Sequence, residues 1–248
     1  MQNKVILITG ANGEIGKALI QKFIKNKSNI IITIDLEKSN NNHIVHESFC
    51  GSILDVELIE KINLKYQISE VYHLAAILST KAEQNPILAK QVNINGTDNI
   101  LNMCASQFKN YNNPILFFFP SSIAVYNTVD NQNKAVTETT CCNNPFTIYG
   151  QSKLQCELNG INIEKNKGID FRCIRFPGII SATSKPTGGT SDYIPEMLHA
   201  TAKGESYNCF VHENTQIPFM TMPDAIGAII QIMTASRNNL KQSVYNIR

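Results

Sequence analysis

The sequence predicts an α/β fold in which a doubly wound parallel sheet carries a small C-terminal lobe. Three observations predict it: short β-branched runs alternate with amphipathic segments, a glycine-rich loop follows the first run, and the alternation stops after Phe176. Strands that alternate with helices form parallel sheets with right-handed crossovers. We therefore expect a first domain over residues 1–176 and a smaller lobe over residues 177–248.

The expected strands are apolar runs short enough to be buried in a parallel sheet. They lie at residues 5–9, 31–35, 71–75, 114–119 and 170–176. Apolar faces predict a helix that begins near Ile15 and a second helix with Leu88, Val92, Asn95, Asn99 and Met103 on one face. A third helix is expected over about 149–165. After Phe176, a Gly/Pro/Ser/Thr stretch precedes an expected helix over 193–203, short strands near 207–211 and 217–221, and a helix over 223–236.

Composition excludes several classes of protein. The chain has 248 residues, enough for a substantial core, and its net charge of +2 gives no reason to expect nucleic acid or an anionic membrane as a partner. It contains no apolar run of membrane-spanning length. Its seven cysteines have no metal-ligand spacing, so we expect free thiols and no metal. The N-terminus leads directly into the first strand, which predicts a cytoplasmic protein.

The glycine-rich loop predicts a dinucleotide site of the Rossmann type. ILITGANGEIG places three glycines between the first strand and the head of a helix. Such a loop lets backbone approach a pyrophosphate, and the helix N-terminus supplies N–H groups and partial positive charge. The strand–loop–helix context makes this signal stronger than a glycine triplet alone. The predicted cofactor contacts in the loop are Gly10, Asn12, Gly13, Glu14, Ile15 and Gly16.

Asp35 ends the second expected strand, at the place where such folds bind the adenosine ribose. A carboxylate there accepts hydrogen bonds from both ribose hydroxyls and repels a 2′-phosphate. The sequence therefore favours NAD over NADP.

Tyr149 and Lys153 form a YxxxK pair near the start of an expected helix, where the i, i+4 spacing places both side chains on one face. Ionising a tyrosine at neutral pH costs ~4 kcal/mol, and a neighbouring ammonium offsets much of that cost. A phenolate so formed can take the proton of an alcohol. Ser121 and Ser122 follow the strand at 114–119, at the sheet edge where ligands bind, and either hydroxyl can orient a substrate oxygen or cap a turn.

Taken together, these residues resemble the extended short-chain dehydrogenases, which include nucleotide-sugar epimerases and dehydratases. The motifs extend over essentially the whole chain: TGANGEIG, HLAA at 73–76, VNINGT at 92–97, PSSIAVY at 120–126, YGQSK at 149–153 and RFPG at 175–178. The resemblance implies a catalytic triad of Ser122, Tyr149 and Lys153. It further implies that His73, together with residues 74–76, lines the adenosine and pyrophosphate side of the cofactor. It also implies cofactor contacts at Ser52, where relatives usually have Asp, and at Ile53, Leu74, Ala75, Ala76, Asn93, Tyr149, Lys153, Pro177 and Ile179.

One subgroup of this family is more similar, the short-chain L-threonine 3-dehydrogenases. The run PTGGTSDYIPEMLHA after the RFPG strand resembles their Gly-Gly-Thr-x-Asp-Tyr segment, and the diphosphate-binding motif of nucleotide-sugar enzymes is absent. This resemblance implies metal-free oxidation of L-threonine by NAD to L-2-amino-3-oxobutanoate, in threonine catabolism, with residues 177–248 binding the substrate. The implied substrate contacts are Ser79, Ser121, Ser122, Tyr149, Gly189, Thr190 and Tyr193.

The resemblance also implies a homodimer in which the helix at about 83–106 and the Tyr/Lys helix form a four-helix bundle with their partners. Relative to the family, the chain ends early, at VYNIR. Two alternatives stay open. One is a nucleotide-sugar epimerase or dehydratase, and the other is a non-catalytic NAD-binding paralogue.

Overall fold

In a computed structural model, the structure describes residues 4–38, 44–126, 135–181, 189 and 191–247. Seven strands form one sheet in the order β3-β2-β1-β4-β5-β6-β9, and every neighbouring pair is parallel. The strands of this sheet are β1 (Lys4–Thr9), β2 (Asn29–Asp35), β3 (Glu47–Cys50), β4 (Glu70–His73), β5 (Ile115–Ser122), β6 (Ile169–Phe176) and β9 (Val244–Asn246). The order reverses between β1 and β4, which places a ligand-binding crevice at their carboxyl ends.

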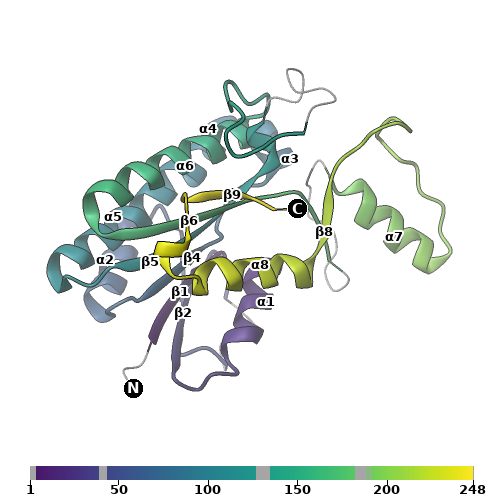
Figure 1. The fold of residues 1–248 in the computed structure, drawn as a ribbon. Coiled ribbons are helices and arrows are strands. Elements are labelled where there is room, and N and C mark those ends of the chain that lie inside the picture. The colour runs from purple at the N-terminus through teal and green to yellow at the C-terminus, as the bar shows by residue number, and fades with distance from the viewer. Residues whose placement is uncertain (1–3, 39–43, 127–134, 182–188, 190, 248) are drawn as a thin grey trace.

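Helices cover both faces of the sheet (Figure 1). The helical segments before the lobe are α1 (Glu14–Phe23), α2 (Val56–Lys65), α3 (Ser79–Gln84), α4 (Pro86–Lys90), η1 (Gln91–Asn95), α5 (Gly96–Tyr111), η2 (Ile123–Val125) and α6 (Ile148–Lys167). Residues of α2, α5 and α6 pack on one face of the sheet around Phe117 and Phe171. On the other face, α1 and α8 (Met222–Thr234) pack around Tyr72 and Phe118. The doubly wound Rossmann-type prediction is confirmed.

The last part of the chain contributes to two units. Here α7 (Tyr193–Lys203) stands away from the sheet, while β7 (Gly178–Ile180) and β8 (Phe219–Thr221) form a separate parallel pair (Figure 1). In contrast, α8 covers the large sheet, and after η3 (Arg237–Asn239) strand β9 joins that sheet beside β6. A lobe built from residues 177–248 alone thus stays a proposal, since α8 and β9 pack with the large sheet.

Three local predictions need correction. The strand expected near 207–211 is wrong, because residues 207–210 have no regular structure and residue 211 is a bend. Phe210 from this segment packs instead edge-on against Tyr193. The single helix expected over about 83–106 is divided at Asn85, which ends α3 and caps α4 by accepting the amide of Leu88. Strands β3, β7 and β9 were not expected, since runs this short leave little periodicity to detect.

Candidate active site

The phosphate loop is pressed against the end of β4. Gly10 has φ +67, a left-handed conformation that favours glycine, and a β-carbon there would lie 2.6 Å from the amide nitrogen of Ala75. The Gly10 amide donates to the carbonyl of Ile34 at 2.9 Å. These contacts fix the loop between β2 and β4, at the crevice where the strand order reverses.

The start of α1 is built to receive an anion. Gly13 occupies the N-cap and supplies no side-chain cap, and Glu14 and Ile15 form the first turn. Gly16 lies one turn in, buried against the backbone of Ala11. The helix N-terminus therefore has no side chain over its cap, and its partial positive charge faces the crevice. This arrangement fits the pyrophosphate of NAD.

Asp35 lies where the adenosine ribose is expected. Its Oδ2 accepts a hydrogen bond of 2.8 Å from the amide of Asn12, and the Asn12 side chain donates to the carbonyl of Glu37 at 2.9 Å. The phosphate loop is thus joined to the end of β2. Oδ1 of Asp35 has no hydrogen-bond partner within the described part of the chain, so this carboxylate fits a ribose diol.

The two adenine-side residues after β3 differ in what they offer. The Ser52 hydroxyl accepts the amide of Leu54 at 3.1 Å, closing its own turn. The Ile53 side chain is buried in the core against Gly96. A contact of Ile53 with a cofactor would therefore have to use its backbone.

Tyr149 is placed beside the end of β5 by a close helix approach. Thr147 caps α6 by accepting the amide of Gly150, and Glu83 of α3 accepts the amide of Ile148 at 2.7 Å. A β-carbon on Gly150 would collide with the carbonyl oxygen of Ala124. Glycine at this position lets the first turn of α6 lie directly on η2.

Lys153 completes the pair one turn further along α6. Its ammonium donates to the carbonyl of Pro120 at 2.7 Å and lies 5.5 Å from the centroid of the Tyr149 ring. It also lies 4.6 Å from the centroid of the Phe119 ring. Lys153 is only 4% exposed, and no carboxylate of the described residues pairs with it. A buried unpaired ammonium is costly and is therefore a marker of function.

The two serines at the end of β5 have different surroundings. The Ser122 hydroxyl accepts the amide of Ala124 at 3.2 Å and caps η2. Ser121 is 3% exposed, and its hydroxyl has no hydrogen-bond partner among the described residues. Ser122 is half-buried at the same strand end as the carbonyl that holds Lys153.

The segment after β4 is fixed by internal hydrogen bonds. Leu74 and Ala75 bond through their amides to the carbonyl and hydroxyl of Thr9, at 3.0 and 3.3 Å, and Ala76 follows in the same half-buried stretch. Asn93 is 2% exposed, and its side chain binds both backbone groups of Ile77. The predicted Asn93 contact with the cofactor is therefore not available to its side-chain amide.

His73 requires a correction. It is 1% exposed, and its two ring nitrogens are bonded to Thr9 and Thr97 at 2.8 and 2.9 Å. Burial, with a smaller contribution from the charge of Lys153, lowers the pKa of His73 to about 3. Its side chain is therefore a neutral part of the core and does not line a cofactor site.

The predicted substrate residues come from two regions. Ser79 begins α3, whereas Tyr193 begins α7 and Gly189 donates its amide to Asp192 at 2.7 Å. Thr190 lies outside the described residues. Pro177 and Ile179 flank Gly178, whose backbone approaches the Phe219 ring too closely for a β-carbon.

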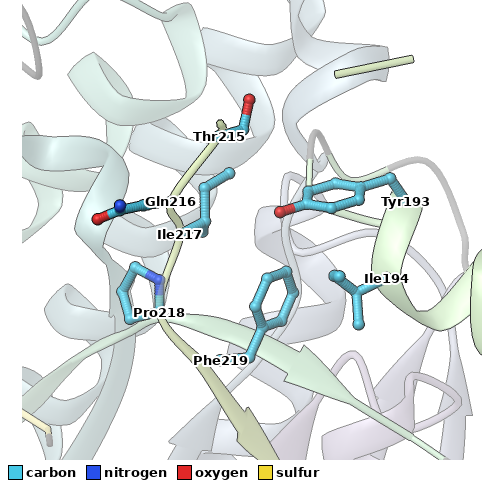
Figure 2. A pocket seen from close by; sticks show the side chains of 7 residues that line it. All are labelled: Tyr193, Ile194, Thr215, Gln216, Ile217, Pro218 and Phe219. Carbon is cyan, nitrogen blue, oxygen red and sulfur yellow. The ribbon is translucent and has the colours of Figure 1, made fainter. Parts of the chain in front are cut away.

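A cavity of about 580 Å³ opens in the lobe beside this strand pair. Tyr193 and Ile194 form one wall, and residues 215–219 form the other (Figure 2). The Tyr193 ring packs edge-on against Phe219, with centroids 5.9 Å apart. Tyr193 therefore belongs both to the predicted substrate set and to this cavity.

Sequence reasoning missed a buried ionic network between α6 and β6. Arg175 of β6 makes a two-pronged pair with Glu157 of α6, at 2.9 and 2.6 Å, and donates to the Tyr126 hydroxyl at 2.7 Å. Both charged side chains are at least nine-tenths buried. The signal was present: arginine inside the apolar run at 169–176 requires a buried acidic partner.

Within the described part of the chain, no group of three His, Cys, Asp or Glu side chains could hold a metal ion. Among the same residues, no helix is both long and apolar enough to cross a bilayer.

Known proteins are similar to this chain over nearly its whole length. The model of the NAD dependent epimerase/dehydratase family matches residues 6–247. The mitochondrial L-threonine 3-dehydrogenase of Bos taurus is 35% identical over 98% of this chain, and this chain spans 63% of that relative's length. A monomeric L-threonine 3-dehydrogenase from a metagenome is 40% identical, with a TM-score of 0.84 over 98% of this chain and 76% of that one. A GalE-like L-threonine dehydrogenase from Cupriavidus necator is 33% identical, with a TM-score of 0.87 over 98% and 77%.

Proposed function

Since this chain belongs to the NAD dependent epimerase/dehydratase family, we propose that it oxidises L-threonine to L-2-amino-3-oxobutanoate with NAD. Membership of an NAD dependent family confirms the prediction that the cofactor is NAD. The threonine assignment rests on relatives that are named threonine dehydrogenases and are 30–40% identical to this chain.

The observation that carries the proposal is the buried ammonium of Lys153 beside Tyr149. Its charge lies 5.5 Å from the centroid of the phenol ring and is not neutralised by any described carboxylate. A positive charge held in a low-dielectric site favours the phenolate over the phenol. A protein that only binds NAD could use these side chains as cofactor contacts, but it would have no need of a phenolate.

Each residue of the triad then has a role. Tyr149 removes the proton from the β-hydroxyl of threonine, and Lys153 stabilises the phenolate. Ser122 holds the same hydroxyl oxygen and opposes charge building up on it. Gly13 and the first turn of α1 would hold the pyrophosphate of NAD, and Asp35 would hold its adenosine ribose. The bound cofactor would supply the acceptor for the hydride of the β-carbon.

We place the substrate between the end of β5 and the lobe. Ser121 offers a buried hydroxyl without a described partner, and Ser79 begins the helix that contacts α6 through Glu83. Tyr193 and Gly189 are the substrate contacts that we propose from the lobe. We keep the division into a cofactor domain, residues 1–176, and a substrate lobe, residues 177–248, as part of the proposal.

The test mixes purified protein with NAD and L-threonine and follows reduced-nicotinamide absorbance. We expect turnover, and we expect Tyr149→Phe to lower kcat by about 10³-fold while NAD still binds. Turnover of a UDP-sugar without threonine oxidation would favour the epimerase or dehydratase alternative. NAD binding with no turnover of any alcohol would favour the non-catalytic paralogue.

A homodimer that pairs the helix expected at about 83–106 and the Tyr/Lys helix with their partners stays a prediction. Residues 83–106 lie in α3, α4, η1 and α5, and the Tyr/Lys helix is α6. Exposed large apolar side chains on these segments include those of Ile87, Leu88 and Leu158, at 75%, 41% and 53% exposure, and such a dimer could cover them. Sedimentation velocity tests it, and a monomer at working concentrations would exclude the bundle.

Cytoplasmic location also stays a prediction, to be tested by cell fractionation.

A further inference from the structure

A line of buried polar groups runs through the middle of the molecule, from the phosphate loop to the catalytic helix. It begins at Thr9, the last residue of β1 and the neighbour of Gly10, and continues through His73 of β4. It then passes through Thr97 of α5 to Asn93 of η1. All four residues are at most 2% exposed. Buried polar groups in such numbers are unusual unless every one is satisfied.

The direction of each bond follows from what each group can donate. The Thr97 hydroxyl lies 2.6 Å from the carbonyl oxygen of Asn93, which can only accept, so its proton is used there. Its oxygen must then accept from Nε2 of His73, 2.9 Å away. Neutral His73 has its one N–H at Nε2, and Nδ1 accepts from the Thr9 hydroxyl at 2.8 Å. The Thr9 oxygen in turn accepts the amide of Ala75.

The line continues from Asn93 into the catalytic helix. The Asn93 amide group donates to the carbonyl of Ile77 at 3.0 Å and to the Ser152 hydroxyl at 3.1 Å, and its oxygen accepts the amide of Ile77 at 2.7 Å. Ser152 donates onward to the carbonyl of Tyr149 at 2.8 Å. From Thr9 to the carbonyl of Tyr149, each group in the series thus donates to the next one.

The local helix geometry supports this reading. Asn93 lies in η1, a single π-helical turn between α4 and α5, and such turns occur often at functional sites. The carbonyl of Asn93 accepts from two side chains, Thr97 and Cys156, the second at 3.0 Å.

We propose that this buried chain, Thr9–His73–Thr97–Asn93–Ser152, positions the phosphate loop relative to the helix that carries Tyr149 and Lys153. These five are positioning residues: none needs to touch cofactor or substrate. The inference rests on the proposed function only for its kinetic readouts. A rigid link here matters because small displacements of reacting groups cost large factors in rate.

The central link is tested by Thr97→Val, which keeps the shape and removes the hydroxyl, with Thr97→Ser as the conservative rescue. We expect Thr97→Val to lower kcat by about tenfold, weaken NAD binding and shift the pH dependence of kcat, and Thr97→Ser to restore all three. The matched control is Thr33→Val. Thr33 is equally buried in β2, but its hydroxyl bonds only Ser48, which is not part of this series of hydrogen bonds. Kinetic parameters of Thr97→Val within about twofold of wild type would overturn the proposal.

The far end is tested by Ser152→Ala, which removes one bond and little volume. We expect kcat to fall while NAD affinity, measured by calorimetry, is retained, because the lost bond lies on the helix and not on the loop. Equal losses of both quantities would contradict the assigned order of the chain.

A measurement independent of turnover keeps the two proposals separate. Nitrogen-15 NMR of the wild-type protein should find His73 neutral with its proton on Nε2, both alone and with NAD. A proton on Nδ1 would overturn the directional chain. If wild-type protein fails to oxidise threonine, the proposed function falls, and the NMR and NAD-affinity results still decide the chain.

Discussion

The ammonium of Lys153 donates a hydrogen bond of 2.7 Å to the backbone carbonyl of Pro120. This bond joins α6 to the carboxyl end of β5, two residues before Ser122. The carbonyl also takes the place of a carboxylate partner, which keeps the positive charge unneutralised. The ammonium therefore lies beside the Tyr149 ring without a carboxylate partner among the described residues, as the proposed role of this pair requires.

Lys153→Met should separate charge from packing. The methionine fills similar apolar space but carries no ammonium, so we expect kcat to fall by about 100-fold or more with the fold retained. Steady-state kinetics with thermal unfolding as the control checks this. Full activity in Lys153→Met would mean that the charge is not used in the reaction.

Asp35→Asn should change cofactor preference. The amide keeps an acceptor for Asn12 but removes the charge that binds a ribose diol and repels a 2′-phosphate. We expect NAD affinity to fall by about tenfold and NADP affinity to rise. Calorimetric titration with both cofactors measures this. Unchanged affinity for NAD would place the adenosine ribose elsewhere.

Gly150→Ala should disturb the site from within the helix. The new β-carbon meets the Ala124 carbonyl, so the first turn of α6 must move away from η2. We expect kcat to fall by about 100-fold. Gly227→Ala is the matched control, because Gly227 lies exposed inside α8 with nothing within 4 Å of the new atom. There the free energy of unfolding should rise by about 0.5–1 kcal/mol.

The fold was largely predictable because its signals are local. The glycine loop, the run PILFFF and the YxxxK helix each carry their own periodicity, and the structure places them as expected. Strand β9 was not predictable, because Val244–Asn246 is too short for a pattern and pairs with residues some 70 positions away in the sequence.

Only those residues of the candidate site that belong to a recognisable sequence motif were predictable. The sequence grouped Ser122, Tyr149 and Lys153 by resemblance and by the order of elements. It assigned His73 and Asn93 to the cofactor, whereas the structure uses both side chains inside the core. Motif spacing identifies which residues matter, but only three-dimensional contacts show whether a polar side chain faces a ligand or another buried group.

Glu157→Gln should destabilise the protein by breaking the buried pair with Arg175. Removing one partner leaves an uncompensated charge, so we expect a loss of about 3–5 kcal/mol in the free energy of unfolding. Urea unfolding measures it. Lys65→Met, which breaks the exposed pair with Glu47, is the control and should change stability little. Similar losses in both variants would rule out a special role for burial.

The free energy of unfolding should fall as the pH is lowered from about 6.5 to about 3, because of His73. The pKa of His73 is about 3 in the folded state and 6.5 in the unfolded state, so in this range only the unfolded state is protonated at His73. The free energy of unfolding is therefore not reduced by His73 above pH ~6.5. Between pH 6.5 and pH 3 it falls by about 1.4 kcal/mol for each pH unit, as the unfolded state takes up the proton. His73→Gln should flatten that slope, and His212→Gln at an exposed position should not. Unfolding measured over this range decides between them.

The most direct test of the central claim uses L-threonine with deuterium on its β-carbon. Proposed oxidation by NAD predicts that the label leaves that carbon and appears in the reduced cofactor, one deuterium for each L-2-amino-3-oxobutanoate formed, and that Tyr149→Phe suppresses both. Mass spectrometry of the reduced cofactor gives the answer. An unlabelled reduced cofactor, or no reduction with threonine at any concentration of NAD, would contradict the account.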